Sequence, residues 1–100
     1  MNFFSNLFNT APKMDFKELL NNGAILLDVR TRGEYAGGHI KNSKNIPLDE
    51  LGRSLPKWDK EQTFIVVCAS GMRSASAVNL MKKNGFANSY NGGSWVNFRE

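Results

Sequence analysis

Apolar positions along the chain follow two patterns: short continuous runs, and longer stretches at helical spacing. The runs at 24–29 and 63–67 are apolar on both faces, as in strands of a parallel sheet with helices above and below. Helical spacing predicts helices at 14–22, from Thr31 to Gly37, from Pro47 to Leu55, at 73–84 and around Trp95. Strands and helices that alternate in this way predict an α/β domain with a mainly parallel sheet.

Capping and turn residues predict where several of these elements begin and end. Thr31 and Glu34 have the spacing of a capping box, which places a helix start between them. Gly85 is suited to end the 73–84 helix, with Phe86 as the apolar contact that closes it. The segments 43–46 and 88–90 are predicted as brief further strands, and Gly92-Gly93 as a turn into the last short helix.

Composition limits the kinds of protein that this chain can be. One hundred residues with 41% hydrophobic content suit a single domain. The net charge of +4 comes from scattered basic residues without an aromatic stripe, so no nucleic-acid partner is expected. One cysteine and one histidine, His39, exclude an internal disulfide and give no cluster of soft metal ligands. Neither a metal nor another cofactor is predicted.

The N-terminal segment differs from the rest of the chain. Its apolar residues Phe3, Phe4, Leu7 and Phe8 share one helical face, so we expect an amphipathic extension at 1–12 before a domain at 13–100. Two interpretations stay open: the face packs on the domain, or it docks on a membrane surface or a partner. The segment lacks a basic region, which makes it a poor signal peptide, and it is too short to span a bilayer, so a membrane is the less favoured partner. A cytoplasmic location is expected, because a lone thiol must be kept reduced.

The single cysteine, Cys68, ends the most apolar run and is followed by a Gly71-containing loop and a predicted helix. Free N–H groups and the dipole at a helix N-terminus favour a thiolate over a thiol. Asp28 ends the other apolar run, and the carboxyl ends of parallel strands meet at one edge of a sheet. We therefore expect a nucleophilic Cys68 with Asp28 nearby.

Several motifs occur in one order along most of the chain. They are Asp28-Val29-Arg30 with Glu34-Tyr35 and Gly38-His39-Ile40; Asn45-Ile46-Pro47; Val67-Cys68-Ala69-Ser70-Gly71-Met72-Arg73-Ser74; and Gly85-Phe86 with Gly92-Gly93 and Trp95. Together they resemble the single-domain rhodaneses, which are sulfurtransferases. The ordered set is specific, although each motif alone is weak.

The resemblance implies a rhodanese-like three-layer domain with a central, mainly parallel five-stranded sheet flanked by helices. It implies a catalytic Cys68 that moves a sulfane sulfur, as a persulfide, from a donor such as thiosulfate to a thiol or cyanide. The implied partners are a small sulfur-containing anion, a thiophilic acceptor, and a protein that donates or accepts sulfur.

The residues after Cys68 are expected to form the substrate-binding loop: Ala69, Ser70, Gly71, Met72, Arg73 and Ser74. Their amides can stabilise an anionic sulfur as an oxyanion hole stabilises oxygen, and Gly71 allows the necessary curvature. For Arg73, attraction of an anionic donor and bracing of the loop both stay open. Ser74 can donate to sulfur or cap the helix. Asp28 and Arg30 are expected to support the site, and His39 and Trp95 to be structural.

Two other functions compete with sulfur transfer by an enzyme. Phosphatases and arsenate reductases that share the fold have five residues between cysteine and arginine, whereas four separate Cys68 from Arg73 here. A phosphoryl group needs a wider ring of amides than one sulfur atom, so the shorter loop favours sulfur. The other alternative is a non-catalytic interaction module or a persulfide carrier whose partner does the chemistry.

Overall fold

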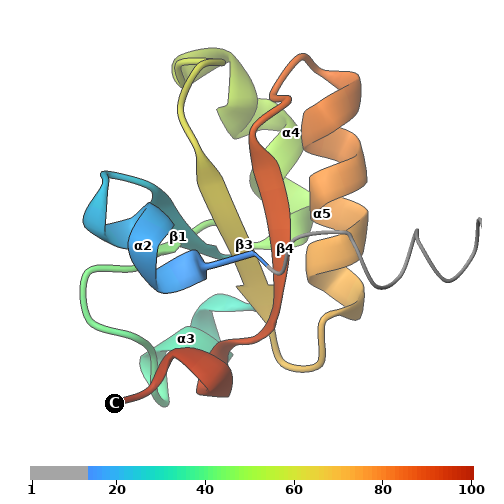
Figure 1. The fold of residues 1–100 in the computed structure, drawn as a ribbon. Helices are drawn as coiled ribbons and strands as arrows, with labels where there is room; N and C mark the ends of the chain where they lie inside the picture. Colours follow the sequence, from blue (N-terminus) through green and yellow to red (C-terminus); the bar gives the residue numbers. More distant parts are fainter. Residues whose placement is uncertain (1–13) are drawn as a thin grey trace, which may run out of the picture.

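The computed structural model describes residues 14–100, so the extension predicted at 1–12 lies outside the described residues. Strands and helices alternate along the chain, as the apolar pattern predicts (Figure 1). The elements in order are α2 (Phe16–Asn21), β1 (Ile25–Asp28), α3 (Arg32–Ala36), β2 (Lys44–Asn45), α4 (Leu48–Ser54), a 3₁₀ helix (Leu55–Lys57), β3 (Phe64–Cys68), α5 (Met72–Lys83), β4 (Ser89–Ser94) and a second 3₁₀ helix (Trp95–Phe98).

The strands form one parallel sheet in the order β2-β1-β3-β4. This confirms the α/β class and the parallel pairing. The expected five strands are a wrong count for residues 14–100, where the sheet has four. The described chain begins just before α2, whose first turn Asp15 caps with its side chain. No further stretch is therefore free to add a strand at that end of the described residues.

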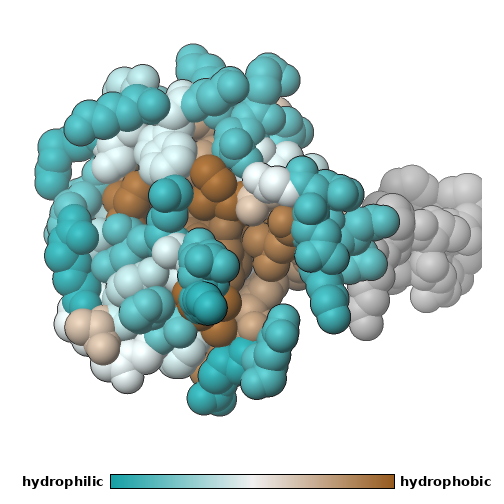
Figure 2. Space-filling model, turned by 90° about the vertical axis from the view of Figure 1, so that its left-hand side faces the viewer, coloured by the Kyte–Doolittle hydropathy of each residue, from teal (hydrophilic) through white to brown (hydrophobic). Residues whose placement is uncertain are grey.

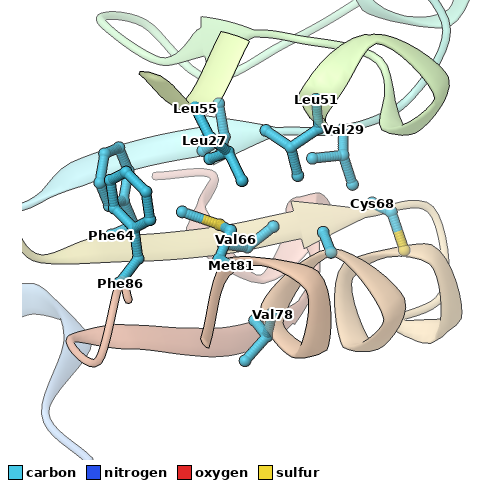
Figure 3. Packing of buried hydrophobic residues seen from close by; sticks show 11 residues of the cluster. Leu27, Val29, Leu51, Leu55, Phe64, Val66, Cys68, Val78, Met81 and Phe86 are labelled. Carbon is cyan, nitrogen blue, oxygen red and sulfur yellow. The ribbon is translucent and has the colours of Figure 1, made fainter. Parts of the chain in front are cut away.

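One face of the sheet is covered by α4 and α5 and holds the main core (Figure 3). All residues of β3 are buried, and alternate ones point to this face because side chains alternate along a strand. The buried residues of this cluster are Leu27, Val29, Leu51, Leu55, Phe64, Val66, Cys68, Ala77, Val78, Met81 and Phe86. Phe64 lies edge-on to both Phe86 and Trp58, with ring centroids 6.0 and 5.5 Å away. The candidate nucleophile thus belongs to a rigid, close-packed layer.

The other face has a thinner cover, made by α2 and the 3₁₀ helix at Trp95–Phe98. Its buried residues are Leu26, Ile65 and Val67. An open hollow of about 670 Å³ lies on this side, and Phe16 and Phe98 are among the residues that line it. Apolar side chains gather in this part of the surface with hydrophilic groups around them (Figure 2). No helix among residues 14–100 has the length and apolar character needed to cross a membrane.

The predicted end signals match the structure closely. Thr31 and Glu34 form a complete capping box. At the end of α5, Gly85 adopts a positive φ of 93° and the Phe86 N–H donates to the Met81 carbonyl at 2.9 Å. These contacts explain why local residue types sufficed to predict both boundaries.

The last strand departs from the prediction. It runs from Ser89 to Ser94 and includes Gly92-Gly93, which the sequence predicts as a turn. A Cβ on Gly92 would lie 2.8 Å from the Ile65 Cγ2, so β4 can lie this close to β3 because Gly92 has no side chain. The register also shifts between Val66 and Val67 opposite this point. Because glycine occupies the position of β4 that packs against β3, this strand lacks the apolar alternation by which a strand is predicted from sequence.

Candidate active site

The sheet brings the ends of β1 and β3 to one edge, as expected for Asp28 and Cys68. Asp28 pairs in register with Val67, the residue before Cys68. After Cys68, a short loop of Ala69–Gly71 leads directly into α5, which begins at Met72. The Cys68 side chain points from the end of β3 toward the first turn of α5 (Figure 3). The site therefore combines a strand end with a helix N-terminus.

The Cys68 sulfur lies in a cradle made by its own loop. It accepts hydrogen bonds from the Gly71 N–H at 3.0 Å and the Ser74 N–H at 3.4 Å, and it lies 3.5 Å from the Ser74 Oγ. Gly71 adopts a φ of 100°, and a Cβ there would meet the Gly93 Cα at 3.3 Å. A side chain at position 71 would thus strain the backbone and crowd β4. The loop conformation that aims the amides at sulfur depends on glycine.

The environment of the sulfur favours its ionised form. Burial of the Cys68 thiol raises its pKa, but hydrogen bonds from the Ser74 hydroxyl and from the Ser74, Gly71 and Ser70 amides outweigh this effect and leave the pKa below its ordinary value. This agrees with the expectation for a thiol at a helix N-terminus. At a given pH, the cradle therefore keeps a larger fraction of Cys68 as the thiolate than an ordinary thiol would have.

The loop after Cys68 presents uncharged residues at the surface. Ala69 and Ser70 are exposed, and Met72 is 78% exposed, whereas Cys68 itself is fully buried. The helix begins one residue earlier than predicted, so Ser74 lies within its first turn and is not its cap. Gly71 holds the N-cap position, without a side-chain cap hydrogen bond. The Ser74 hydroxyl is therefore available for contacts inside the site.

Arg73 forms a two-pronged ion pair with Glu34. Its Nη1 and Nη2 donate to the two carboxylate oxygens at 2.7 and 3.0 Å. The hydrogen bonds from Arg73 and then from the Thr31 N–H hold the pKa of Glu34 down at about 2. Glu34 thus caps α3 and, at the same time, ties α3 to the first turn of α5. Of the two interpretations left open for Arg73, this geometry is that of a brace.

Asp28 and Arg30 form a buried ion pair beside the site. The Arg30 Nε lies 3.0 Å from both Asp28 carboxylate oxygens, and its Nη2 lies 2.8 Å from Oδ2. Their side chains are 1% and 5% exposed. Among the described residues, no hydrogen bond joins either side chain to the sulfur. The pair therefore lies at the end of β1, in register with the end of β3, and takes no part in the hydrogen bonds of the cradle.

Arg30 also organises the chain that follows α3. It donates to the carbonyls of Gly38 at 2.7 Å and Glu34 at 3.3 Å, and its guanidinium lies 4.3 Å from the centroid of the Trp95 ring. On β2, the neighbouring strand, the Asn45 Nδ2 donates to the carbonyls of Asp28 and Arg30. The Arg30 side chain therefore links the end of β1 to α3, to Gly38 and to Trp95.

His39 lies away from the cradle. Its ring stacks on Tyr35 with 3.9 Å between centroids, and its Nδ1 is 2.8 Å from the Tyr35 carbonyl oxygen. Within residues 14–100, no group of three or more His, Cys, Asp or Glu side chains could hold a metal ion. The histidine has the structural surroundings that the sequence predicts for it.

Asn91, on β4, is a site residue that the sequence did not indicate. Its Oδ1 lies 2.6 Å from the Ser74 Oγ, and its Nδ2 donates to the Gly71 carbonyl at 3.1 Å. Asn91 precedes the two glycines predicted as a turn, so its polarity needed no other explanation in the sequence. Only the parallel pairing of β4 with β3 brings it to the cysteine loop.

Comparison with known proteins agrees with this geometry. A family model described as the rhodanese-like domain matches residues 13–100. The chain belongs to the rhodanese-like family. Its fold is similar to that of the human single-domain sulfurtransferase TSTD1, with a TM-score of 0.76 and 28% identity over 90% of this chain and 99% of that one. The cysteine loop described above is thus part of a rhodanese-like domain.

Two curated relatives of this rhodanese-like chain bear names from sulfur metabolism. A tRNA sulfurtransferase of Thermoplasma acidophilum is 31% identical over 77% of this chain, which spans 15% of that protein. A candidate sulfur carrier protein of Bacillus subtilis, YrkF, is 38% identical over 74% of this chain, which spans 38% of that protein. The chain thus spans less than half the length of either relative.

Proposed function

We propose that this rhodanese-like protein is a sulfurtransferase that carries a sulfane sulfur as a persulfide on Cys68. The observation that carries the proposal is the cradle of loop amides around the sulfur of the chain's single cysteine. Thiosulfate is the small donor, and a thiol or cyanide is the acceptor. The names of the sulfurtransferase and sulfur-carrier relatives support the chemical class.

The first half-reaction loads sulfur onto the protein. The Cys68 thiolate attacks the outer sulfur of thiosulfate, a new S–S bond forms, and the old S–S bond breaks. The bonding electron pair leaves with sulfite, so no oxidant or reductant is needed. The loop amides around Gly71 stabilise the Cys68 thiolate during this attack. They already point at the Cys68 sulfur before the donor arrives.

The second half-reaction transfers the sulfur from the Cys68 persulfide to the acceptor. A thiolate or cyanide attacks the outer sulfur of the persulfide, and the electron pair of the broken S–S bond returns to Cys68 as a thiolate. The amides of Gly71 and Ser74 are within hydrogen-bond reach of the inner sulfur and stabilise it as a leaving group. The same cradle therefore serves both halves of a ping-pong cycle.

A persulfide carrier is the second candidate function, favoured by the relationship to the candidate carrier of Bacillus subtilis. The uncharged, exposed rim at Met72 suits an approaching protein surface as well as a small acceptor. Both functions share the Cys68 persulfide and differ in the acceptor. Rapid turnover with cyanide or a small thiol indicates an enzyme, and a stable persulfide that small acceptors discharge slowly indicates a carrier.

Treatment with thiosulfate should add the mass of one sulfur atom to the intact protein and release an equal amount of sulfite. A later wash with excess small thiol should remove the added mass, because the persulfide is open to attack by thiolates. Intact-protein mass spectrometry with a parallel sulfite assay measures both. If neither thiosulfate nor an alkyl persulfide adds sulfur to the folded protein, the proposal is wrong.

Replacing Glu34 by Gln should slow sulfur transfer several-fold while changing the free energy of unfolding by less than about 1 kcal/mol, the usual range for ion pairs at the surface. The change releases Arg73, so the amides at the start of α5 are held less firmly toward sulfur. Steady-state rates and urea unfolding measure the two effects.

The control for this variant is Glu50→Gln, because Glu50 forms a similar exposed pair with Arg32 that does not involve the cysteine loop. It should leave the transfer rate unchanged. Equal rates in both variants would show that the Glu34 pair does not organise the site.

A further inference from the structure

A chain of hydrogen bonds leads from the candidate nucleophile to β4. The Cys68 sulfur lies 3.5 Å from the Ser74 Oγ, which lies 2.6 Å from the Asn91 Oδ1. Ser74 is fully buried. Asn91 is held in turn by the Gly93 N–H, which donates to its Oδ1 at 2.9 Å, and by the Gly71 carbonyl, which accepts from its Nδ2 at 3.1 Å.

These contacts determine which group donates in each hydrogen bond between Asn91, Ser74 and the sulfur. The Gly93 N–H can only donate and the Gly71 carbonyl can only accept, so the Asn91 oxygen must face Ser74. An amide oxygen carries no proton, so the Ser74 hydroxyl donates its single proton to Asn91. Ser74 then offers the sulfur a lone pair, which is the right partner for an S–H donor. At the Ser74 hydroxyl the arrangement therefore fits the thiol form of Cys68, whereas the Gly71 and Ser74 N–H groups fit a thiolate.

A thiolate reverses what Ser74 must do. The ionised sulfur can only accept, so the Ser74 hydroxyl has to turn toward it to form a charge-assisted hydrogen bond. That turn breaks the 2.6 Å hydrogen bond to the Asn91 Oδ1. Asn91 and the sulfur therefore compete for one proton, which stays bonded to the Ser74 oxygen throughout. The proton of the thiol itself leaves to solvent.

We propose that Asn91 is a positioning residue that acts on Cys68 through Ser74, holding the hydroxyl proton while Cys68 is a thiol and yielding it when the sulfur becomes an anion. The switch operates when the thiolate forms and again when the persulfide is discharged. This inference rests on the proposed function for the role of Cys68, but its test needs no sulfur donor. Asn91 also donates to the carbonyl of Gly71, the residue whose N–H faces the sulfur.

Three ion pairs lie on the elements around the site. Arg73 of α5 pairs with Glu34 of α3, Asp28 and Arg30 pair at the end of β1, and Glu50 of α4 pairs with Arg32. On β4, Tyr90 is next to Asn91 in sequence and points to the opposite face of the sheet. Among the described residues, none of these side chains hydrogen bonds to the sulfur. Among the described residues, Ser74 is thus the side chain in hydrogen-bond contact with the sulfur.

The test is the pKa of Cys68 in Asn91 variants, measured from the pH dependence of the iodoacetamide rate and from the ultraviolet absorbance of the thiolate. Asn91→Ala removes the competitor for the Ser74 proton, so the pKa should fall by about 0.5 to 1 unit. Asn91→Leu, an apolar residue of similar shape, should give the same fall and serves if the alanine variant does not fold. A pKa that rises or stays unchanged in folded variants overturns the proposal.

The control is the same substitution in a Ser74→Ala background. Without the hydroxyl there is no proton to release, so Asn91→Ala should no longer lower the pKa. An equal fall in both backgrounds would mean that Asn91 acts by another route, such as the Gly71 carbonyl, and would also overturn the proposal. A protein that shows these shifts but never forms a persulfide would refute the proposed function and leave this inference standing.

Discussion

Replacing Cys68 by Ser is expected to abolish persulfide formation and to reduce sulfur transfer at least about a thousandfold. A serine oxygen in this cradle is not ionised at neutral pH and cannot form the S–S bond on which both half-reactions depend. The chain has no second cysteine to take over. Intact mass after thiosulfate treatment and the rate of thiocyanate formation from cyanide measure the loss.

The fold of this variant should survive, which separates chemistry from structure. Cys68 is fully buried in the main core, but a serine of nearly the same shape can still accept from the Gly71 N–H. Its cost should be about 1 kcal/mol. Cys68→Ala leaves the Gly71 and Ser74 amides without their acceptor and should cost more, by about 1 to 3 kcal/mol. Added sulfur on a folded serine variant would contradict the assignment of the persulfide to Cys68.

The sequence predicted those parts of the fold that depend on local chemistry. The run at 63–67 and the loop after it predicted both β3 and the place of Cys68 at a helix N-terminus, because burial on two faces leaves a continuous apolar run. The capping box of α3 and the glycine at the end of α5 were also correct for local reasons. The fifth strand was wrong for the described residues, and it came from the family resemblance alone, not from an apolar run.

The contacts that complete the candidate site join residues far apart in the sequence. Glu34 has a sufficient local role as a helix cap, so nothing in its own segment indicates that it also pairs with Arg73, 39 residues later. Asn91 gave no signal because Gly92, which lets β4 approach β3, also removes the alternation by which strands are predicted. Parallel pairing decides which distant polar groups meet, and periodicity along one segment carries no information about it.

The largest effect on stability is expected from Asp28, whose loss leaves the buried Arg30 without its counter-charge. Asp28→Ala should lower the free energy of unfolding by about 3 to 5 kcal/mol, because an unpaired buried charge keeps its desolvation cost. For a domain of this size, that corresponds to a fall in Tm of about 12 °C or more. Urea and thermal unfolding measure the two quantities. The exposed ion pair of Arg32 and Glu50 supplies a control, since Glu50→Ala should lower the free energy of unfolding by less than about 1 kcal/mol.

Removing Arg30 as well distinguishes a charge effect from a simple loss of packing. In the double variant Asp28→Ala/Arg30→Met no charge is left behind, and the methionine can still cover Trp95, on which the guanidinium lies. We therefore expect the double variant to be more stable than Asp28→Ala alone, because removing both members of a buried pair costs less than removing one. The double variant is less stable than Asp28→Ala alone if the losses from Asp28→Ala and Arg30→Met simply add. In that case the hydrogen bonds of Arg30 to the Gly38 and Glu34 carbonyls outweigh the effect of its unpaired charge, and the pair stabilises the fold mainly through those hydrogen bonds.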